Sequence, residues 1–227
     1  MEGRISMEDN LVKSKSRVKQ FGEVYTPSEI VKNMLDLDGI RECSYGISKT
    51  FLEPSCGNGN FLIEILNRKL DSVGKIELDN YDVNLCKAIS SVYGIEIQMD
   101  NVIECRNRLE KLVEDTYTEF NGKEMDAKLK NVVSLILSKN ILCGDTLDGV
   151  EYKANKIKTD KPLIITEWIF DNDMVERKEI EFNNLIKENN ILYNTYNKEY
   201  EKVHYMSVKK AKTKKEESDE FNLADIL

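Results

Sequence analysis

A short apolar segment that runs into a glycine-containing turn and then into a helix constrains this chain more than any other feature. Residues 50–52 predict a buried strand, residues 54–59 a turn, and residues 61–66 carry apolar side chains at helical spacing. Gly57 and Gly59 allow a sharp turn and a close approach of the backbone to a ligand. The N-terminus of the following helix suits a carboxylate or a phosphate. The glycine pair alone fits an ordinary tight turn equally well.

The rest of the chain alternates short apolar strands with amphipathic helices. Residues 93–97 and 140–143 predict further strands, and helices are expected at 28–38, 83–92, 102–113 and 125–137. Connections of this length are typical of parallel βαβ units. We therefore expect an α/β fold in three layers, a parallel sheet covered by helices.

The character of the sequence changes after Gly149. Residues 162–170 and 178–182 predict two strands that form a hairpin about a polar turn, and residues 183–203 have weak helical periodicity. The lysine cluster at 209–215 is expected to be a solvated tail, with phosphate contact as the alternative. The expected division is a polar arm (1–20), a core (21–150), a hairpin with a helical extension (151–208) and a charged tail (209–227).

Composition excludes several classes of protein. The longest run without a charge has ten residues, whereas a bilayer span needs about 20, and the N-terminal residues resemble no targeting signal, so we expect a cytoplasmic protein without a membrane partner. Five scattered cysteines and a single histidine predict neither disulfides nor a metal site. With 33 basic and 41 acidic residues the net charge is −8, so any DNA partner must be gripped mainly by another chain.

Two acids bracket the glycine turn. Glu53 follows the first strand and can pair with an ammonium group, while Glu96 lies at the end of the next strand and can accept two hydrogen bonds from ribose hydroxyls. A pyrophosphate would be repelled by Glu53. A ligand with an amino acid part and a nucleoside part fits all three features, and S-adenosylmethionine is such a ligand.

Four segments then carry a resemblance to a known family. The run Phe51–Leu62, FLEPSCGNGNFL, resembles motif I of the adenine-N6 DNA methyltransferases of restriction-modification systems. Residues 21–27 resemble the motif that precedes it, residues 94–97 resemble motif II and residues 143–145 resemble motif III. The motifs occur in the family's order and cover about residues 20–150. The resemblance implies a Rossmann-like methyltransferase sheet, with an insertion of two helices between motifs I and II.

The resemblance also implies site residues. It assigns Glu96 to the ribose, Ile97 to packing on the adenine, Asp145 to the neighbourhood of the adenine amino group, and the segment around Tyr25 to covering the methionine part. The expected cofactor-binding residues are Tyr25, Thr26, Pro27, Glu53, Pro54, Cys56, Gly57, Gly59, Asn60, Phe61, Glu96, Ile97 and Asp145.

The catalytic signature of that family is missing. It consists of Asp, Asn or Ser, then Pro-Pro, then an aromatic residue, which hold the target amine and stack on the flipped base. The chain has three prolines and no two are adjacent. Residues 164–170 stand where the signature would follow, and Trp168 there is expected in the core rather than as a stacking platform, as His204 is expected on the surface. No catalytic residue is identified, and the sheet is expected to be incomplete.

Three functions remain open. The first is the cofactor-binding half of an adenine-N6 DNA methyltransferase, which contacts double-stranded DNA through a partner chain that supplies catalysis and target recognition. The second is a module that binds the cofactor or a partner without transferring a methyl group. The third, ranked last, is an enzyme that methylates RNA or protein through another catalytic motif.

Overall fold

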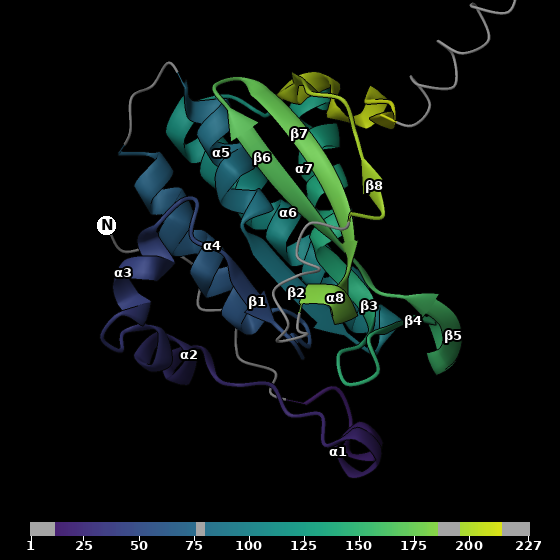
Figure 1. Cartoon of the computed structure of the whole chain (residues 1–227). Helices are drawn as coiled ribbons and strands as arrows, with labels where there is room; N and C mark the ends of the chain where they lie inside the picture. Colours follow the sequence, from purple (N-terminus) through teal and green to yellow (C-terminus); the bar gives the residue numbers. More distant parts are fainter. Residues whose placement is uncertain (1–11, 76–79, 186–195, 215–227) are drawn as a thin grey trace, which may run out of the picture.

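A five-stranded mixed sheet forms the centre of the fold (Figure 1). The structure is a computed structural model that describes residues 12–75, 80–185 and 196–214. The strands lie in the order β1 (Phe51–Glu53), β2 (Val92–Glu96), β3 (Ile141–Asp145), β4 (Val150–Lys153) and β5 (Ile157–Pro162). The first three are parallel, as the sequence predicts, whereas β4 and β5 run antiparallel and were not predicted.

The register brings the carboxyl-terminal ends of the parallel strands to one edge of the sheet. Glu53 lies opposite Gly94, and Glu96 lies opposite Cys143. The side chains of β2 alternate between the two faces, as pleating requires.

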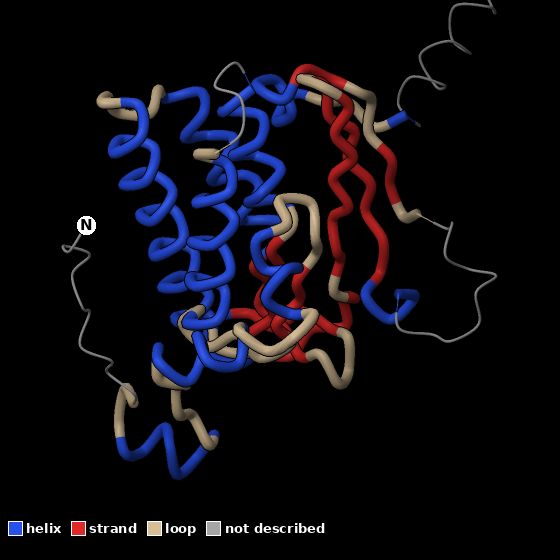
Figure 2. The backbone as a smooth tube through the Cα atoms, turned by 90° about the vertical axis from the view of Figure 1, so that its left-hand side faces the viewer, coloured by secondary structure: helices blue, strands red, loops and turns tan. Residues whose placement is uncertain are grey.

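Four helices pack against one face of the sheet (Figure 2). They are α4 (Asn60–Val73), α5 (Tyr81–Ser90), α6 (Met99–Asn121) and α7 (Ala127–Asn140). Leu62, Leu85, Leu109 and Leu129 are fully buried between them. Two helices, α4 and α5, separate β1 from β2, which confirms the two helices predicted in this interval.

The opposite face of β2 is covered by a β-hairpin rather than by helices. We expected helices on both faces; instead β6 (Ile164–Asp171) and β7 (Met174–Glu181) pack there (Figure 2). Tyr93 donates its hydroxyl hydrogen to the carbonyl oxygen of Thr166 at 2.7 Å, and Ile95 packs with Ile165. The hairpin itself is confirmed. It occupies this face because the helices between β1 and β3 all pack together on the other one.

The prediction of a helical extension after the hairpin is wrong for residues 198–204, where two short strands form. After α8 (Phe182–Leu185), the strands β8 (Lys198–Glu199) and β9 (Val203–His204) pair with β7, followed by the 3₁₀ helix η3 (Tyr205–Lys210). The strands form because they satisfy the backbone groups on the open side of β7. In the tail, Lys214 pairs with Glu176 and Glu199. The remaining parts of the extension and tail, and residues 1–11 of the arm, lie outside the described residues.

Three short helices precede the sheet: α1 (Lys15–Phe21), α2 (Ser28–Leu35) and α3 (Ile40–Tyr45). The sequence predicts one helix over residues 28–38, but α2 ends at Leu35. Gly39 directly precedes α3 as its N-cap, where its N–H donates to Glu42 at 3.0 Å. The buried Arg68 of α4 contacts both helices. It donates to the carbonyl of Leu35 and pairs with Asp36 at the end of α2, and it donates to the hydroxyl of Ser44 in α3 at 3.3 Å. No helix in the described ranges has the length and apolarity needed to cross a membrane.

Candidate functional site

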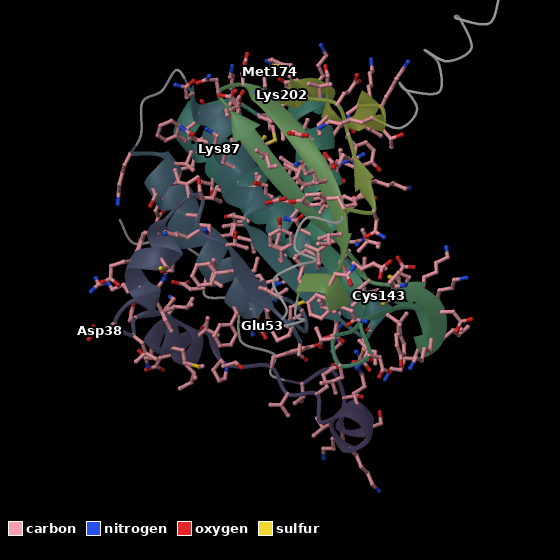
Figure 3. The ribbon with its side chains drawn as sticks, viewed as in Figure 1. Asp38, Glu53, Lys87, Cys143, Met174 and Lys202 are labelled. Atoms are coloured by element: carbon pink, nitrogen blue, oxygen red, sulfur yellow. The ribbon has the colours of Figure 1, made fainter. Side chains whose placement is uncertain are left out.

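A pocket opens at the carboxyl-terminal ends of β1 and β2, beside the turn that joins β1 to α4. Residues 22–26, 53–61 and 96–98 contribute to its wall. Glu53 and Cys143, labelled in Figure 3, mark the edge of the sheet at which the parallel strands end. The lining residues are Gly22, Glu23, Val24, Tyr25, Thr26, Glu53, Ser55, Cys56, Gly57, Asn58, Asn60, Phe61, Glu96, Ile97 and Gln98.

Two glycines shape the turn after β1. Gly57 has φ 52° and Gly59 has φ 91°, both in the left-handed region that favours glycine. A Cβ on Gly57 would lie 3.2 Å from the ring of Tyr25, and one on Gly59 would lie 2.5 Å from Sγ of Cys105. The first glycine therefore admits the segment that carries Tyr25, and the second lets α6 pack against the start of α4.

Glu96 ends β2, and two backbone N–H groups hold its carboxylate. Oε2 accepts a hydrogen bond from Gly57 at 3.0 Å, and Oε1 accepts one from Gln98 at 2.8 Å. The residue is 7% exposed, and burial raises the pKa of its carboxyl group, while these two hydrogen bonds oppose the rise. The side chain of Asn101 is a third hydrogen-bond donor to this carboxylate. Because a carboxylate has about four lone-pair sites, Glu96 keeps acceptor capacity for a ligand.

Glu53 stands on the other side of the turn, at the end of β1. Burial raises the pKa of its carboxyl group, and a hydrogen bond to the backbone of Ser55 opposes that rise. Among the residues that the structure describes, the charged ones that line the pocket are all acids: Glu23, Glu53 and Glu96. Such a lining favours a ligand that carries positive charge and disfavours a pyrophosphate.

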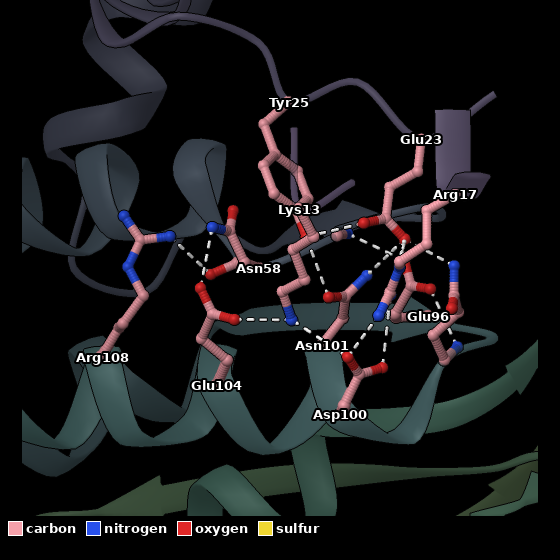
Figure 4. Close-up of polar contacts among 12 residues, drawn as sticks. Lys13, Arg17, Glu23, Tyr25, Asn58, Glu96, Asp100, Asn101, Glu104 and Arg108 are labelled. Carbon is pink, nitrogen blue, oxygen red and sulfur yellow. Dashed lines mark hydrogen bonds and ion pairs between the residues drawn. The ribbon is translucent and has the colours of Figure 1, made fainter. Parts of the chain in front are cut away.

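The wall formed by residues 22–26 is anchored through Glu23 (Figure 4). Its Oε2 accepts hydrogen bonds from the guanidinium of Arg17 at 2.6 and 2.9 Å and from the amide of Gln98 at 2.5 Å. The hydroxyl of Tyr25 donates to Oε1 at 3.0 Å and lies 2.9 Å from Oδ1 of Asn101. One buried network therefore joins this wall to the start of α6.

Ion pairs place α1 beside the same end of α6 (Figure 4). Arg17 pairs with Asp100 at 2.5 Å, and Lys13 pairs with Glu104 at 2.7 Å. The hydrogen bond from Arg17 is the main reason that the pKa of Asp100 falls to about 2. We call these ion pairs of Lys13 and Arg17 with α6 the clasp between α1 and α6. Through Arg17 and Glu23, the clasp holds residues 22–26 against the pocket.

The structure brings most of the predicted cofactor-binding residues together. Those that line the pocket are Tyr25, Thr26, Glu53, Cys56, Gly57, Asn60, Phe61, Glu96 and Ile97. Pro27, Pro54, Gly59 and Asp145 do not line it. Asp145 instead accepts the N–H of Leu147 at 2.8 Å and closes the turn after β3. The binding roles of all these residues stay predictions.

Sequence reasoning missed six lining residues: Gly22, Glu23, Val24, Ser55, Asn58 and Gln98. Glu23 lies inside residues 21–27, a segment that the resemblance names, so the sequence indicated that it lies near the site. Its role as an anchor could not be inferred from the sequence. Gln98 lies two residues beyond Glu96 and directly precedes α6. Only the folded chain shows that it bridges Glu23 and Glu96.

Trp168 lies against the core and His204 lies on the surface, as the sequence predicts. The indole N–H of Trp168 donates to Oδ1 of the buried Asn140 at 2.8 Å, and the ring packs against the hydrophobic core. His204 is exposed, 3.5 Å from Asp173, and pairs in register with Met174, which Figure 3 shows at the opposite end of the molecule from Glu53.

The pocket contains no activated thiol. All five cysteines are free, and the pKa of Cys56 is raised by a hydrogen bond with Cys105 and by burial, so this lining residue stays a protonated thiol. Within residues 12–75, 80–185 and 196–214, no group of three or more His, Cys, Asp or Glu side chains is arranged to hold a metal ion.

Comparison of the chain with models of protein families, with curated proteins and with solved structures finds no match.

Proposed function

We propose that this chain is the cofactor-binding half of an adenine-N6 DNA methyltransferase that uses S-adenosylmethionine. The observation that carries the proposal is the acidic pocket at the ends of two parallel strands, in which Glu53 and Glu96 stand on either side of a glycine turn. S-adenosylmethionine carries a sulfonium and an ammonium group, which suit this charge, and a ribose, whose hydroxyl groups suit the remaining acceptor capacity of Glu96.

The residues present fit this cofactor. Glu96 would accept hydrogen bonds from the ribose hydroxyls, and Glu53 would pair with the ammonium group. The half-buried side chains of Phe61 and Ile97 offer apolar surface for the adenine, and the N-terminus of α4 offers N–H groups to the carboxylate. Tyr25, anchored through Glu23, would cover the methionine part. When bound, the cofactor supplies an electrophilic methyl group.

The chain's own residues would bind and orient the cofactor, but they do not form a site for the base that accepts the methyl group. No Pro-Pro step exists in the sequence to present a carbonyl and an aromatic platform to a flipped adenine. The net charge of −8 also leaves the grip on DNA phosphates to a basic partner. We therefore place catalysis and target recognition on a second chain, and expect the isolated chain to transfer no methyl group or very little.

The missing signature also favours a second candidate, a module that binds the cofactor or a partner and never transfers a methyl group. A neighbouring reading frame with an Asn-Pro-Pro-Tyr sequence separates the two. Methyl transfer to DNA when that product is added supports the first candidate. A gene neighbourhood without such a frame, or persistent absence of transfer with it, contradicts the first and supports the second.

Calorimetric titration of the purified chain tests cofactor binding. We expect one saturable site for S-adenosylmethionine and none for NAD, because the acids repel a pyrophosphate. Glu96→Ala should weaken binding about tenfold or more, since it removes hydrogen bonds to a charged acceptor. Glu124→Ala is the matched control, an exposed glutamate outside the pocket. Equal binding by both variants would contradict the proposal.

A further inference from the structure

Exposed apolar side chains gather on one side of the molecule, around α2, α3 and β1. Leu37 is 57% exposed and Leu52 is 44% exposed, although both are large and apolar. The exposed apolar and aromatic residues of this region are Ile30, Met34, Leu37, Ile40, Tyr45 and Leu52. A cluster of this kind, rather than scattered single residues, marks a surface that binds another molecule.

Four of these residues, Met34, Leu37, Ile40 and Leu52, line an apolar groove along β1. Its lining residues are Met34, Leu35, Leu37, Ile40, Phe51, Leu52, Glu53, Phe61 and Ile65. In the part of the chain that the structure describes, β1 pairs with β2 on one side only, so its other side presents unpaired backbone groups. An apolar groove beside an open strand suits a strand from another polypeptide.

The groove adjoins the proposed cofactor pocket. Glu53 and Phe61 line both cavities, on either side of the end of β1. A strand added to β1 would therefore lie next to the pocket and complete its wall.

Charge identifies the kind of strand. Glu53 is the one charged residue in the groove lining, among the described residues. The segment that frames the groove, residues 28–53, contains five acids and three bases. Asp36 is paired with Arg68 of α4, which leaves four acids, among them Asp38 and Glu53, labelled in Figure 3. A strand with basic ends complements this surface, whereas a second copy of this chain would set acids against acids.

We propose that this groove docks a β-strand of a different polypeptide, with apolar side chains on alternate residues and lysine or arginine at its ends. The strand extends the sheet beyond β1. The identification of this polypeptide as the chain that carries the amine-binding site rests on the proposed function. The docking itself does not.

Hydrogen exchange and titration with a defined peptide test the proposal on the full chain. The probe is a nine-residue peptide in which isoleucine and valine alternate with threonine between two lysines at each end. Its comparison peptide has glutamates in place of the lysines. We expect the lysine-ended peptide to slow exchange of the Leu52 amide, which points to the open side of β1, since the neighbouring Phe51 amide already donates to Ser91. We also expect it to bind about tenfold more tightly than the glutamate-ended peptide.

Two variants locate the binding surface. Leu37→Asn should weaken the lysine-ended peptide about fivefold, because it removes apolar contact area from the groove. Ile157→Asn is the matched control, since Ile157 on β5 is also 57% exposed and lies outside the groove. Neither exposed substitution should alter thermal unfolding.

The outcomes are distinct. Unchanged exchange of the Leu52 amide, equal binding of the two peptides, or equal effects of the two variants would overturn the docking surface. A parallel titration with S-adenosylmethionine on the same preparation reports on the proposed function. Failure of that titration alone removes the methyltransferase partner and leaves the docking surface in place.

Discussion

Gly57 is the residue at which the turn after β1 meets the wall of the pocket. Its φ of 52° and the 3.2 Å approach of a Cβ to the Tyr25 ring both oppose a larger side chain. We expect Gly57→Ala to cost about 1–3 kcal/mol of unfolding free energy, because left-handed strain alone costs about 1–2 kcal/mol. In thermal unfolding that corresponds to about 2–4 °C per kcal/mol for a chain of this size.

Gly122→Ala is the control for this substitution. Gly122 has a similar φ of 65°, and a Cβ there meets nothing within 4 Å. It should therefore show the strain alone and leave binding of S-adenosylmethionine unchanged, while Gly57→Ala weakens it. Equal losses of stability and affinity in both variants would contradict the contact between Gly57 and Tyr25.

The positions of Glu53 and Glu96 were predictable at the residue scale. Acids that follow parallel strands meet at one edge of a sheet, and the structure places both in the pocket. The hydrogen bonds that hold Glu96 were not predictable, because Gly57 lies 39 residues away in the chain. Asp145 was predictable as the end of a strand but lies outside the pocket lining.

At the scale of elements, the clasp between α1 and α6 depends on Arg17. The pKa of Asp100 falls from 3.8 to about 2, so this carboxylate stabilises the folded chain above pH 3.8, and that contribution is lost as the pH falls toward about 2. Arg17→Met should raise the pKa of Asp100 toward 3.8 in an NMR titration. It should also weaken cofactor binding, because Glu23 loses its anchor.

Lys19→Met provides the comparison, since Lys19 is an exposed base on the same helix. It should leave the pKa of Asp100 and the affinity unchanged. A low pKa of Asp100 that persists in Arg17→Met would contradict the clasp.

Asn140, the last residue of α7, joins that helix to β2 and to the hairpin. Its amide donates to the carbonyls of Ser90 and Val92 at 3.0 Å, and its oxygen accepts from Trp168. Because each buried group left unpaired costs about 1–3 kcal/mol, Asn140→Ala should lower the unfolding free energy by about 3 kcal/mol or more in denaturant titrations. Asn131→Ala, exposed on the same helix, should change it by less than about 0.5 kcal/mol. Similar losses in both would refute this role.

Periodicity predicted the long helices and the β6–β7 hairpin, because their apolar residues recur over many positions. It missed α3, β8 and β9, which are too short to carry a pattern. It also missed the pair β4–β5, whose lysine-rich strands are held by pairing at an edge rather than by an apolar face.

At the scale of the whole molecule, the order of the strands decides which surfaces are free. The sequence could not predict that β1 lies at the edge of the sheet, since strand order depends on pairings between distant segments. That position creates the apolar groove beside the pocket. The pocket supports the proposed cofactor binding, and the groove supports the proposed docking of a strand from another polypeptide.

The most direct test of this account is a titration of the full, isotope-labelled chain with S-adenosylmethionine, followed through backbone amide NMR signals. The account predicts saturable shifts concentrated in residues 22–26, 53–61 and 96–98, which form the pocket. Absence of shifts at millimolar cofactor, or shifts centred elsewhere in the chain, would contradict it.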